Sequence, residues 1–325
     1  MSAAESTHAP LVAVITPVYN GARYLRETME SVQAQSYPNL VHVLLDNAST
    51  DATPDIIRSF ENGSVPLQVV RNPETVPFTD NWERAVQITP PEAAYFRILA
   101  ADDKIMPTGI EAMAAIASAN PSIGVVGCGF QVMDTVQTSA WPDGVTVLPG
   151  REAVRRFFMG EGEIIGPHIL FRRDVLKMRT PFFDSRYNGI DTEVCLHALR
   201  RCDWGVTTGI LGWTRVHEDS LSARVMHASG LHFSDWVRYI DAYGGWAMDE
   251  DDRTRHERAF LRYYLRRLMR WRAQKNGAVT WRNHIAVLRE VARAPKPLDF
   301  ADAVADVVLK RIGLRDAVRA GYPLG

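Results

Sequence analysis

The chain contains little cysteine: three residues, Cys128, Cys195 and Cys202, in a total of 325. Three cysteines cannot form a complete set of disulfides, and their spacing is not that of a zinc site. We therefore expect reduced, structural thiols in a cytosolic protein.

The sequence also lacks long apolar runs and a surplus of one charge. No segment offers the roughly 18 consecutive apolar residues that a membrane span needs. Residues 1–10 lack the basic start and apolar core of a signal peptide and are expected to form a flexible tail. The formal net charge of −1 gives no general case for nucleic-acid binding.

The sequence does contain apolar, strand-like segments that alternate with segments of helical periodicity. The expected strands cover residues 11–17, 41–45, 67–70 and 95–101, and the expected helices cover 22–35, 54 onwards, 79–88 and 108–119. Such an alternation predicts βαβ units and an α/β fold with a mostly parallel central sheet.

Polar side chains follow these strands where they end: Tyr19, Asp46, Arg71 and the adjacent pair Asp102 and Asp103. Right-handed crossovers place the ends of parallel strands on one rim of the sheet, where α/β proteins bind their ligands. Two neighbouring carboxylates repel each other unless they share a cation, and oxygen ligands suit Mg²⁺ or Mn²⁺. The alternative interpretation is a solvated Asp-Asp turn before the helix that begins near Pro107.

The later part of the chain is less regular. Further strands are expected at 123–132, 168–171 and 204–216, with a helix at 150–159 and another that opens at Gly189-Ile190-Asp191. Asp191 lies near the N-terminus of that helix, where the helix dipole favours a carboxylate; a capping role and a catalytic role are compatible there. After about Ser222 the sequence is typical of helices only. We expect one domain over residues 11–225 and a helical extension over 226–325.

Several of these segments resemble, in the same order, motifs of the family 2 glycosyltransferases. They are Thr16-Pro17-Val18-Tyr19-Asn20, Asp46-Asn47-Ala48-Ser49-Thr50-Asp51, Leu99-Ala100-Ala101-Asp102-Asp103, Ile190-Asp191-Thr192-Glu193, and Trp213-Thr214-Arg215-Val216-His217 with Ser220. The resemblance covers residues 11–222 and implies the GT-A fold, which is Rossmann-like, for the first domain. It also implies an inverting transfer of a sugar from a nucleoside-diphosphate sugar to an acceptor hydroxyl, in glycan or polysaccharide biosynthesis. A UDP-sugar is favoured.

The resemblance assigns nucleotide-sugar binding to a group of residues at the strand ends: Pro17, Tyr19, Asn20, Asp46, Asn47, Arg71 and Asp102. Tyr19 would stack on the base, and Asp46 would accept a hydrogen bond from the uracil or the ribose. Their structural alternatives are an aromatic residue packed on the sheet and a turn residue at a strand end.

The resemblance further assigns Asp103 and His217 to a divalent cation, Mn²⁺ or Mg²⁺, which would act as a Lewis acid on the departing nucleoside diphosphate. A single histidine has a structural role about as often as it is a metal or phosphate contact. Asp191 would be the general base that takes the proton of the acceptor hydroxyl. Glu193 stands two residues later, points to another part of the helix surface, and is the weaker candidate.

The chain departs from the family pattern at three positions. Asn47 stands where the family often has a second aspartate, Ala100 where it often has an aspartate, and Ile190 where it often has a glutamate. Fewer acidic residues are therefore available to contact the donor. The sequence does not identify the donor sugar, the nucleotide or the acceptor. Specificity is expected in the loops at 134–149 and 161–167.

The tail contains a basic amphipathic helix, in which seven arginines at 255–272 alternate with apolar residues. Such a helix could lie on an anionic membrane surface, which would suit a lipid-linked acceptor. We favour packing of its apolar stripe on the first domain or on a second copy of the chain, with the arginines solvated or paired with the acidic residues 249–252. We accordingly expect a cytoplasmic protein, with contact to the inner face of the membrane as the alternative.

Two other classes of protein are alternatives to the transferase. A dinucleotide-dependent oxidoreductase needs G-x-G-x-x-G after the first strand, where this chain has Tyr19-Asn20-Gly21. A non-catalytic nucleotide-sugar-binding protein of the same fold is favoured by the missing carboxylates and opposed by Asp103, Asp191 and His217.

Overall fold

A computed structural model of the protein describes residues 9–137, 141, 144–164, 166–218, 220, 230–273 and 277–315. The chain divides into two compact units. The sheet unit comprises Met1–Gly150, Ile164–Ser185 and Ala198–Val216, and the helical unit comprises Arg151–Glu163, Arg186–His197 and His217–Gly325. Residues 1–8 of the expected tail and the expected boundary at 225 and 226 lie outside the described residues.

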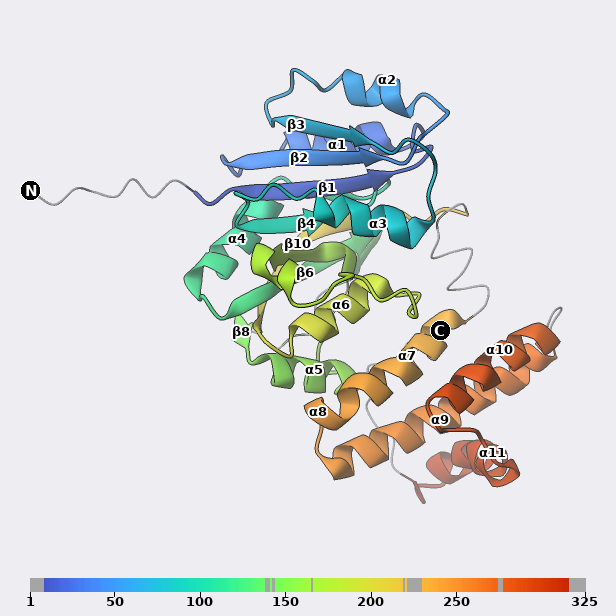
Figure 1. Ribbon diagram of the computed structural model, residues 1–325. Helices are drawn as coiled ribbons and strands as arrows, with labels where there is room; N and C mark the ends of the chain where they lie inside the picture. The colour runs from blue at the N-terminus through green and yellow to red at the C-terminus, as the bar shows by residue number, and fades with distance from the viewer. Residues whose placement is uncertain are drawn as a thin grey trace, which may run out of the picture. The chain divides into compact units, whose positions relative to one another are not determined.

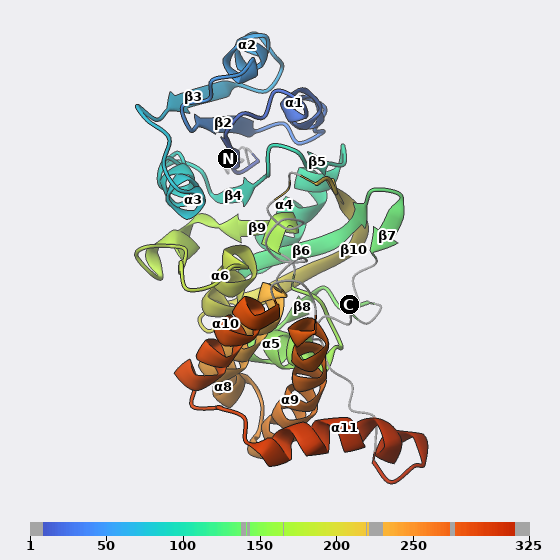
Figure 2. The ribbon, with the colours of Figure 1, turned by 90° about the vertical axis from the view of Figure 1, so that its right-hand side faces the viewer.

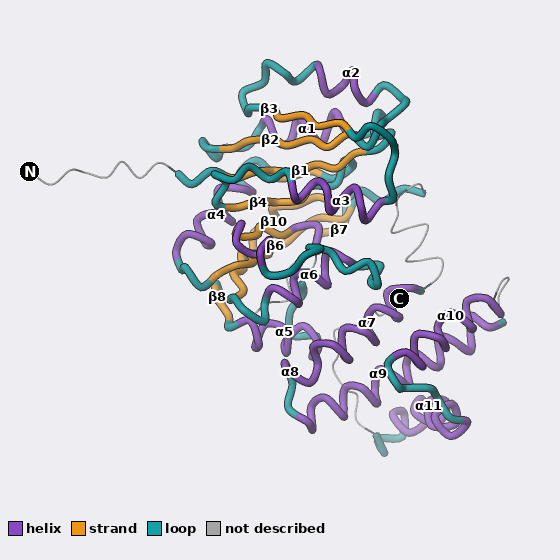
Figure 3. The backbone as a smooth tube through the Cα atoms, in the orientation of Figure 1, coloured by secondary structure: helices purple, strands orange, loops and turns teal. Residues whose placement is uncertain are grey.

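The sheet unit is built on a sheet with the strand order β3-β2-β1-β4-β9-β6-β10-β5, in which β7 also pairs with β6 and β8 with β10 (Figures 1 and 3). The strands are β1 Val12–Val18, β2 Leu40–Asp46, β3 Leu67–Arg71, β4 Tyr95–Ile98, β5 Lys104–Ile105, β6 Ile123–Val132, β7 Thr135–Gln137, β8 Val147–Leu148, β9 Ile169–Arg172 and β10 Asp203–Thr214. β1 is parallel to β2 and β4, β2 to β3, and β6 to β10. The prediction of a mostly parallel α/β sheet is confirmed.

The central strands are buried on both faces. Every residue of β1 and β2 is buried, which is typical of strands covered by helices on both sides of a sheet. The covering helices are α1 Leu25–Gln33, α2 Thr53–Arg58, α3 Phe78–Gln87 and α4 Gly109–Ala119. Val12 and Val14 of β1 pack in one cluster with Val32 of α1 and Met113 of α4, while α3 lies on the opposite side of the sheet (Figure 2).

The expected strands and helices are present, with ends shifted by a few residues. β5, β7 and β8 were not expected, because strands of two or three residues carry no readable alternation. β9 is antiparallel to both β4 and β6, so it interrupts the parallel order in the middle of the sheet. β4 ends at Ile98, and the acidic pair lies in a turn in which the backbone N–H of Asp103 donates to the carbonyl of Ala100 (3.2 Å).

The helical unit consists of α5 Gly150–Met159, α6 Ile190–Ala198, α7 Leu231–Tyr239, the π-helical turn η4 Ile240–Gly244, α8 Gly245–Ala247, α9 Glu250–Arg272, α10 Gly277–Glu290 and α11 Pro297–Arg311. The first residue of α5 and the last residue of α6 belong to the sheet unit. No described helix is both long enough and apolar enough to cross a membrane.

The basic helix α9 buries its apolar stripe inside the helical unit. His256, Phe260, Tyr264 and Leu268 recur every fourth residue and are buried, as expected for one face of a helix. The ring of Phe233 on α7 stacks on Tyr264 with centroids 5.4 Å apart. On a neighbouring side, two arginines form ion pairs with α11: Arg262 with Asp302 (2.5 Å) and Arg266 with Asp306 (2.8 Å). In the acidic run 249–252, Asp249 instead caps α9 by accepting from the backbone N–H of Asp252 (2.7 Å).

Candidate functional site

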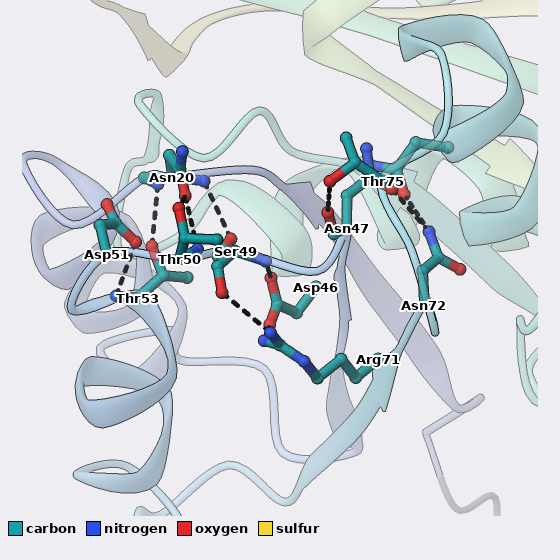
Figure 4. Close-up of polar contacts among 12 residues, drawn as sticks. Asn20, Asp46, Asn47, Ser49, Thr50, Asp51, Thr53, Arg71, Asn72 and Thr75 are labelled. Atoms are coloured by element: carbon teal, nitrogen blue, oxygen red, sulfur yellow. Dashed lines mark hydrogen bonds and ion pairs between the residues drawn. The ribbon is translucent and has the colours of Figure 1, made fainter.

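The loops that follow β1 and β2 are held together by hydrogen bonds (Figure 4). Three consecutive backbone N–H groups donate to side chains of the second loop: Asn20 to Ser49 Oγ (2.9 Å), Gly21 to Thr53 Oγ1 (2.9 Å) and Ala22 to Asp51 Oδ2 (3.0 Å). The side chain of Asn20 accepts from the backbone N–H of Thr50 (2.8 Å), and Asn20 itself has a positive φ of 48°. Because these N–H groups already have acceptors within the chain, this loop does not resemble the open phosphate cradle that an oxidoreductase needs.

The strand register brings the predicted residues of β1, β2 and β3 to one level. Val18 pairs with Asp46, and Asp46 pairs with Arg71, so these positions lie side by side across three strands. Tyr19 follows at the end of β1 with 51% of its surface exposed, whereas Pro17 is buried within the strand. The side chain of Tyr19 therefore stands open to a ligand at this rim.

Asp46 is buried. Its carboxylate forms an ion pair with Arg71 and accepts from the backbone N–H of Ser49 (2.9 Å), and Arg71 also donates to the carbonyl of Ser49 (2.8 Å) (Figure 4). A buried carboxylate is stable only with such partners. The pair fixes the loop after β2 and leaves the guanidinium of Arg71 half exposed at the rim.

Asn47 has a structural explanation for its departure from the family pattern. Its side-chain N–H donates to the carbonyl of Val76 (2.9 Å), while its oxygen accepts from the backbone N–H of Val76 (3.0 Å) and from the side chain of Asn72 (2.8 Å). An aspartate could not donate to that carbonyl. Asn47 is buried, and its amide holds the segment after β3 on the loop after β2.

The adjacent pair Asp102 and Asp103 lies between the end of β4 and β5. Asp103 is only 5% exposed, and its Oδ1 accepts from the backbone N–H of Arg215 (3.0 Å). Burial and the neighbouring charge of Asp102 raise the pKa of Asp103 to about 7. Since the ionised form is disfavoured by the protein alone, a bound cation would stabilise it, and paired carboxylate oxygens suit a hard divalent cation.

No cluster of three or more His, Cys, Asp or Glu side chains that could hold a metal occurs among the described residues. Asp103 and Asp102 belong to the sheet unit, and His217 is the first residue of the last segment of the helical unit. The side-chain oxygens of the two aspartates are of the kind that a divalent cation prefers. The assignment of His217 to a cation stays a prediction.

Arg215 is a residue of this site to which the sequence analysis gave no role. Its guanidinium donates to the carbonyl of Asp102 (3.2 Å) and to Glu27 (2.8 Å), and it lies over the rings of Tyr24 (4.5 Å) and Trp213 (4.7 Å). The available signal was its place in the strand-end motif, two positions before His217. The guanidinium of Arg215, a positive charge that contacts the backbone of the acidic pair, is suited to bind a diphosphate.

Arg97, which lies buried in β4, is a second residue to which the sequence analysis gave no role. It is fully buried and donates to Met113 Sδ (3.2 Å) and to the Nδ1 atom of His168 (3.2 Å). Because Nδ1 of His168 accepts, its Nε2–H donates to the hydroxyl of Thr214 (2.7 Å). Burial and Arg97 lower the pKa of His168 well below its usual value, so this ring is neutral. The positive charge of Arg97 opposes the rise in the pKa of Asp103.

In the helical unit, Asp191 lies in the first turn of α6. Its Oδ1 accepts from the backbone N–H of Thr192 (2.8 Å), and burial raises the pKa of its carboxyl. Glu193 is 1% exposed and accepts a hydrogen bond from the hydroxyl of Tyr243. Since the carboxylate of Glu193 is buried and bonded within the protein, Asp191 is the better candidate for a base.

Residues 13–179, about half of the chain, match the family model described as Glycosyl transferase family 2. The chain therefore belongs to glycosyl transferase family 2, and the family that its motifs resemble is confirmed.

Curated relatives share short segments with this chain. It is 43% identical over 61 residues to the putative teichuronic acid biosynthesis glycosyltransferase TuaG of Bacillus subtilis, a match that covers 19% of this chain and 24% of that protein. An uncharacterized glycosyltransferase of Rickettsia typhi is 43% identical over 56 residues, which cover 17% of this chain and 18% of that protein. The matches thus span about a fifth of the length of these relatives.

Solved structures share the fold over nearly the whole chain. The structure of S. aureus TarS 1–349 in complex with UDP-GlcNAc has a TM-score of 0.62 and 16% identity, and the match covers 97% of both chains. The mannosyltransferase PcManGT from Pyrobaculum calidifontis, in complex with GDP-Man and Mn²⁺, has a TM-score of 0.56 and 19% identity, and the match covers 94% of this chain and 81% of that one. At this identity the likeness shows the fold, which is of the GT-A type with a C-terminal helical region.

Proposed function

We propose that this protein is an inverting, metal-dependent glycosyltransferase that moves a sugar from a nucleoside-diphosphate sugar to an acceptor hydroxyl. A UDP-sugar is the favoured donor, and glycan or glycoconjugate biosynthesis is the favoured setting. The observation that carries the proposal is the carboxylate pair Asp102 and Asp103 at the strand-end rim of a family 2 fold. The pKa of Asp103 is raised to about 7, as expected for a ligand that ionises fully only with a cation.

In this proposal the rim of the sheet binds the donor. Tyr19 offers an exposed ring to the base, Asp46 and Arg71 meet the nucleoside, and Asp103 with Asp102 holds the cation, with His217 as a further ligand. Arg215 meets the diphosphate. A bound divalent cation would supply Lewis-acid stabilisation of the charge on the departing diphosphate.

The transfer itself needs a base. Asp191 takes the proton of the acceptor hydroxyl while the hydroxyl oxygen forms a bond to the anomeric carbon of the sugar. The bond from that carbon to the phosphate oxygen breaks, and its electron pair leaves with the nucleoside diphosphate. Attack from the face opposite the leaving group inverts the anomeric configuration.

The protein is expected in the cytoplasm, because its three cysteines are all free, as in a reducing compartment. The donors bound by the structural relatives, UDP-GlcNAc for TarS and GDP-Man for PcManGT, are the first two to be tried. The acceptor is a hydroxyl of a glycan, a lipid-linked saccharide or a small molecule.

Calorimetric titration with UDP and GDP, with and without Mn²⁺, tests the binding part of the proposal. We expect one nucleotide to bind only with the cation and Asp103→Ala to abolish that binding. Asp55→Ala is the matched control, because Asp55 is an exposed aspartate on α2 that pairs with Arg58. Nucleotide binding that needs neither the cation nor Asp103 would contradict the metal site.

The second candidate function is non-catalytic binding of a nucleotide sugar, favoured by the loss of acidic family positions at Asn47 and Ala100. Release of nucleoside diphosphate from UDP-GlcNAc or GDP-mannose distinguishes the two. Turnover that Asp191→Asn lowers by about 10²–10⁴-fold supports the transferase. Tight binding of a donor without turnover, in the presence of a panel of acceptors, would favour the binding protein.

A further inference from the structure

The residues just before Asp191 form hydrogen bonds with α7, a helix of the same unit. The carboxylate of Asp235, on α7, accepts from the backbone N–H of Asn188 (3.0 Å), from the side chain of Asn188 (3.1 Å) and from the backbone N–H of Gly189 (2.8 Å). Asp235 is 1% exposed. The backbone N–H groups of the two residues that precede α6 are thus satisfied by a side chain some fifty residues away in the sequence.

Two tyrosines extend this contact along α7 and the following π-helical turn. The hydroxyl of Tyr239 donates to the carbonyl of Gly189 (2.8 Å), and its ring stacks on Tyr187 with centroids 5.2 Å apart. The hydroxyl of Tyr243 donates to Glu193 on α6. Asp235, Tyr239 and Tyr243 are four residues apart, so successive turns present them to the same segment.

The π-helical turn η4 Ile240–Gly244 carries Tyr243. Such turns are rare and are found mostly as single insertions in α-helices, frequently at functional sites. This one lies where the hydroxyl of Tyr243 donates to Glu193 on α6.

Gly189 is the point where these groups converge on Asp191. A Cβ atom at Gly189 would lie 2.8 Å from the hydroxyl of Tyr239, 3.7 Å from Oδ2 of Asp235 and 3.9 Å from Oδ1 of Asp191. The first of these distances leaves no room for a side chain. The approach of α7 to the residue before α6 is therefore set by contacts as tight as those of a packed core.

The carboxylate of Asp235 satisfies the backbone N–H groups of Asn188 and Gly189 and thereby fixes this segment. Burial raises the pKa of Asp235 although three N–H groups and Arg238 stabilise its charged form. An apolar side chain in its place would leave the N–H groups of Asn188 and Gly189 without this acceptor. What the carboxylate adds is direction, since several N–H groups aimed at two oxygens fix the backbone in one orientation.

We propose that Asp235 and Tyr239 are positioning residues that hold the carboxylate of Asp191 in place for proton transfer. This inference rests on the proposed function, in which Asp191 is the general base. Misplacement of a reacting group by about 1 Å can cost a rate on the order of 10²-fold. Loss of either contact therefore lowers the rate of the chemical step and leaves nucleotide binding, which the proposed function assigns to other residues, unchanged.

The experiment uses the full chain with the variants Asp191→Asn, Asp235→Asn and Tyr239→Phe. Tyr264→Phe is the matched control, because its hydroxyl is also buried in the helical unit but bonds to His284 rather than to the segment before α6. The probes are UDP-GlcNAc and GDP-mannose, with release of nucleoside diphosphate as the readout. Amide hydrogen exchange over residues 187–194 is measured on the same proteins.

We expect Asp235→Asn and Tyr239→Phe to lower kcat by about 10-fold to 10²-fold with the KM for the donor unchanged, while Tyr264→Phe keeps the wild-type rate. Exchange at residues 187–194 should quicken in the first two variants and not in the control. Equal losses of rate in Tyr239→Phe and Tyr264→Phe would indicate a general effect on stability and overturn the inference.

The pH profile adds a readout that a purely structural role would not move. Asp235 acts on the charge of Asp191, and Tyr239 lies close enough to Asp191, Asp235, Glu193 and Tyr187 for all four to act on it. Burial is the main cause of the raised pKa of Asp191 and the charge of Asp235 adds to it, so Asp235→Asn should move the acid limb of kcat to lower pH. An acid limb that stays in place, together with unchanged exchange at residues 187–194, would overturn the inference.

The outcomes separate the two proposals. If Asp191→Asn keeps the wild-type rate, the assignment of the base fails, and the positioning role fails with it. If Asp191→Asn abolishes turnover and neither Asp235→Asn nor Tyr239→Phe lowers it, only the inference fails. If the wild type turns over neither donor, exchange still decides: unchanged protection of residues 187–194 in Tyr239→Phe would overturn the inference, and faster exchange would support it.

Discussion

The backbone N–H of Arg215 donates to Oδ1 of Asp103 at 3.0 Å, and this bond joins the end of β10 to the acidic pair that follows β4. The bond lowers the pKa of Asp103, but burial and the adjacent charge of Asp102 outweigh it, and the pKa stands at about 7. The protein therefore keeps a carboxyl group that is largely protonated below neutral pH at the rim of its sheet. This one group links stability, pH and cation binding.

The first prediction concerns Asp103→Asn in metal-free buffer. The pKa of Asp103 is raised from about 3.9 in the unfolded chain to about 7 in the folded protein, so the folded state binds more protons between these values. The contribution of Asp103 to the free energy of unfolding is thus fully present below about pH 4 and is lost as the pH rises through about 7. Asp103→Asn should flatten this part of the stability–pH curve and, at pH 8, raise Tm by about 2 °C or more.

The measurement is thermal unfolding from pH 4 to pH 8, with Asp55→Asn as a control on an exposed aspartate. Addition of Mn²⁺ with UDP should raise Tm of the wild type at pH 8 and leave Asp103→Asn unchanged. A wild-type Tm that does not fall relative to Asp103→Asn between pH 5 and pH 8 would show that Asp103 is ionised without a cation.

The second prediction concerns Asn47→Asp, which introduces the residue that the family often has. The new carboxylate would be buried against the carbonyl of Val76, to which Asn47 now donates. We expect a loss of about 1–3 kcal/mol in the free energy of unfolding, measured by urea denaturation, because a buried acceptor would lose its donor. The matched control is Asn39→Asp, since Asn39 donates to the carbonyl of Ala9 at an exposed site and should cost less than 1 kcal/mol. Equal costs at the two sites would contradict this explanation of Asn47.

The third prediction concerns Arg97→Met, which replaces a buried cation by an apolar side chain of similar length. Arg97 lowers the pKa of Asp103, so its removal should raise that pKa further. Cation-dependent nucleotide binding needs the ionised form of Asp103, and its acid limb should therefore move to higher pH. Titration of UDP with Mn²⁺ at several pH values tests this, with Arg58→Met, an exposed arginine, as the control. An unchanged acid limb would show that the charge of Arg97 does not act on the acidic pair.

The ends of the strands were predictable from the sequence, because the apolar run of each parallel strand and the polar residues that follow it are local features of the chain. The apolar runs of β1 and β2 predicted where these strands end to within a residue or two. In the structure, the strand register places Asp46 beside Arg71. The role of Arg97 was not predictable, because a charged residue inside a strand gives no sign of its neighbours on other strands. The contact of Asp235 with the segment before Asp191 depends on helix packing across some fifty residues, which no local spacing encodes.

The last prediction concerns Arg215, whose guanidinium lies at 4.5 Å and 4.7 Å from the ring centroids of Tyr24 and Trp213 and donates to Glu27. These contacts hold the guanidinium of Arg215 beside Asp102 and Asp103, where it can bind a diphosphate. Arg215→Met keeps much of the apolar contact with the rings and removes the charge, so we expect UDP affinity in the presence of Mn²⁺ to fall by about tenfold, as for loss of one charge-assisted hydrogen bond. Glu27→Gln is the informative companion, because it removes the anion that competes with the ligand for Arg215. If Arg215 contacts the diphosphate, Glu27→Gln should keep or strengthen UDP binding; if Arg215 only braces the loop, both variants should weaken it alike.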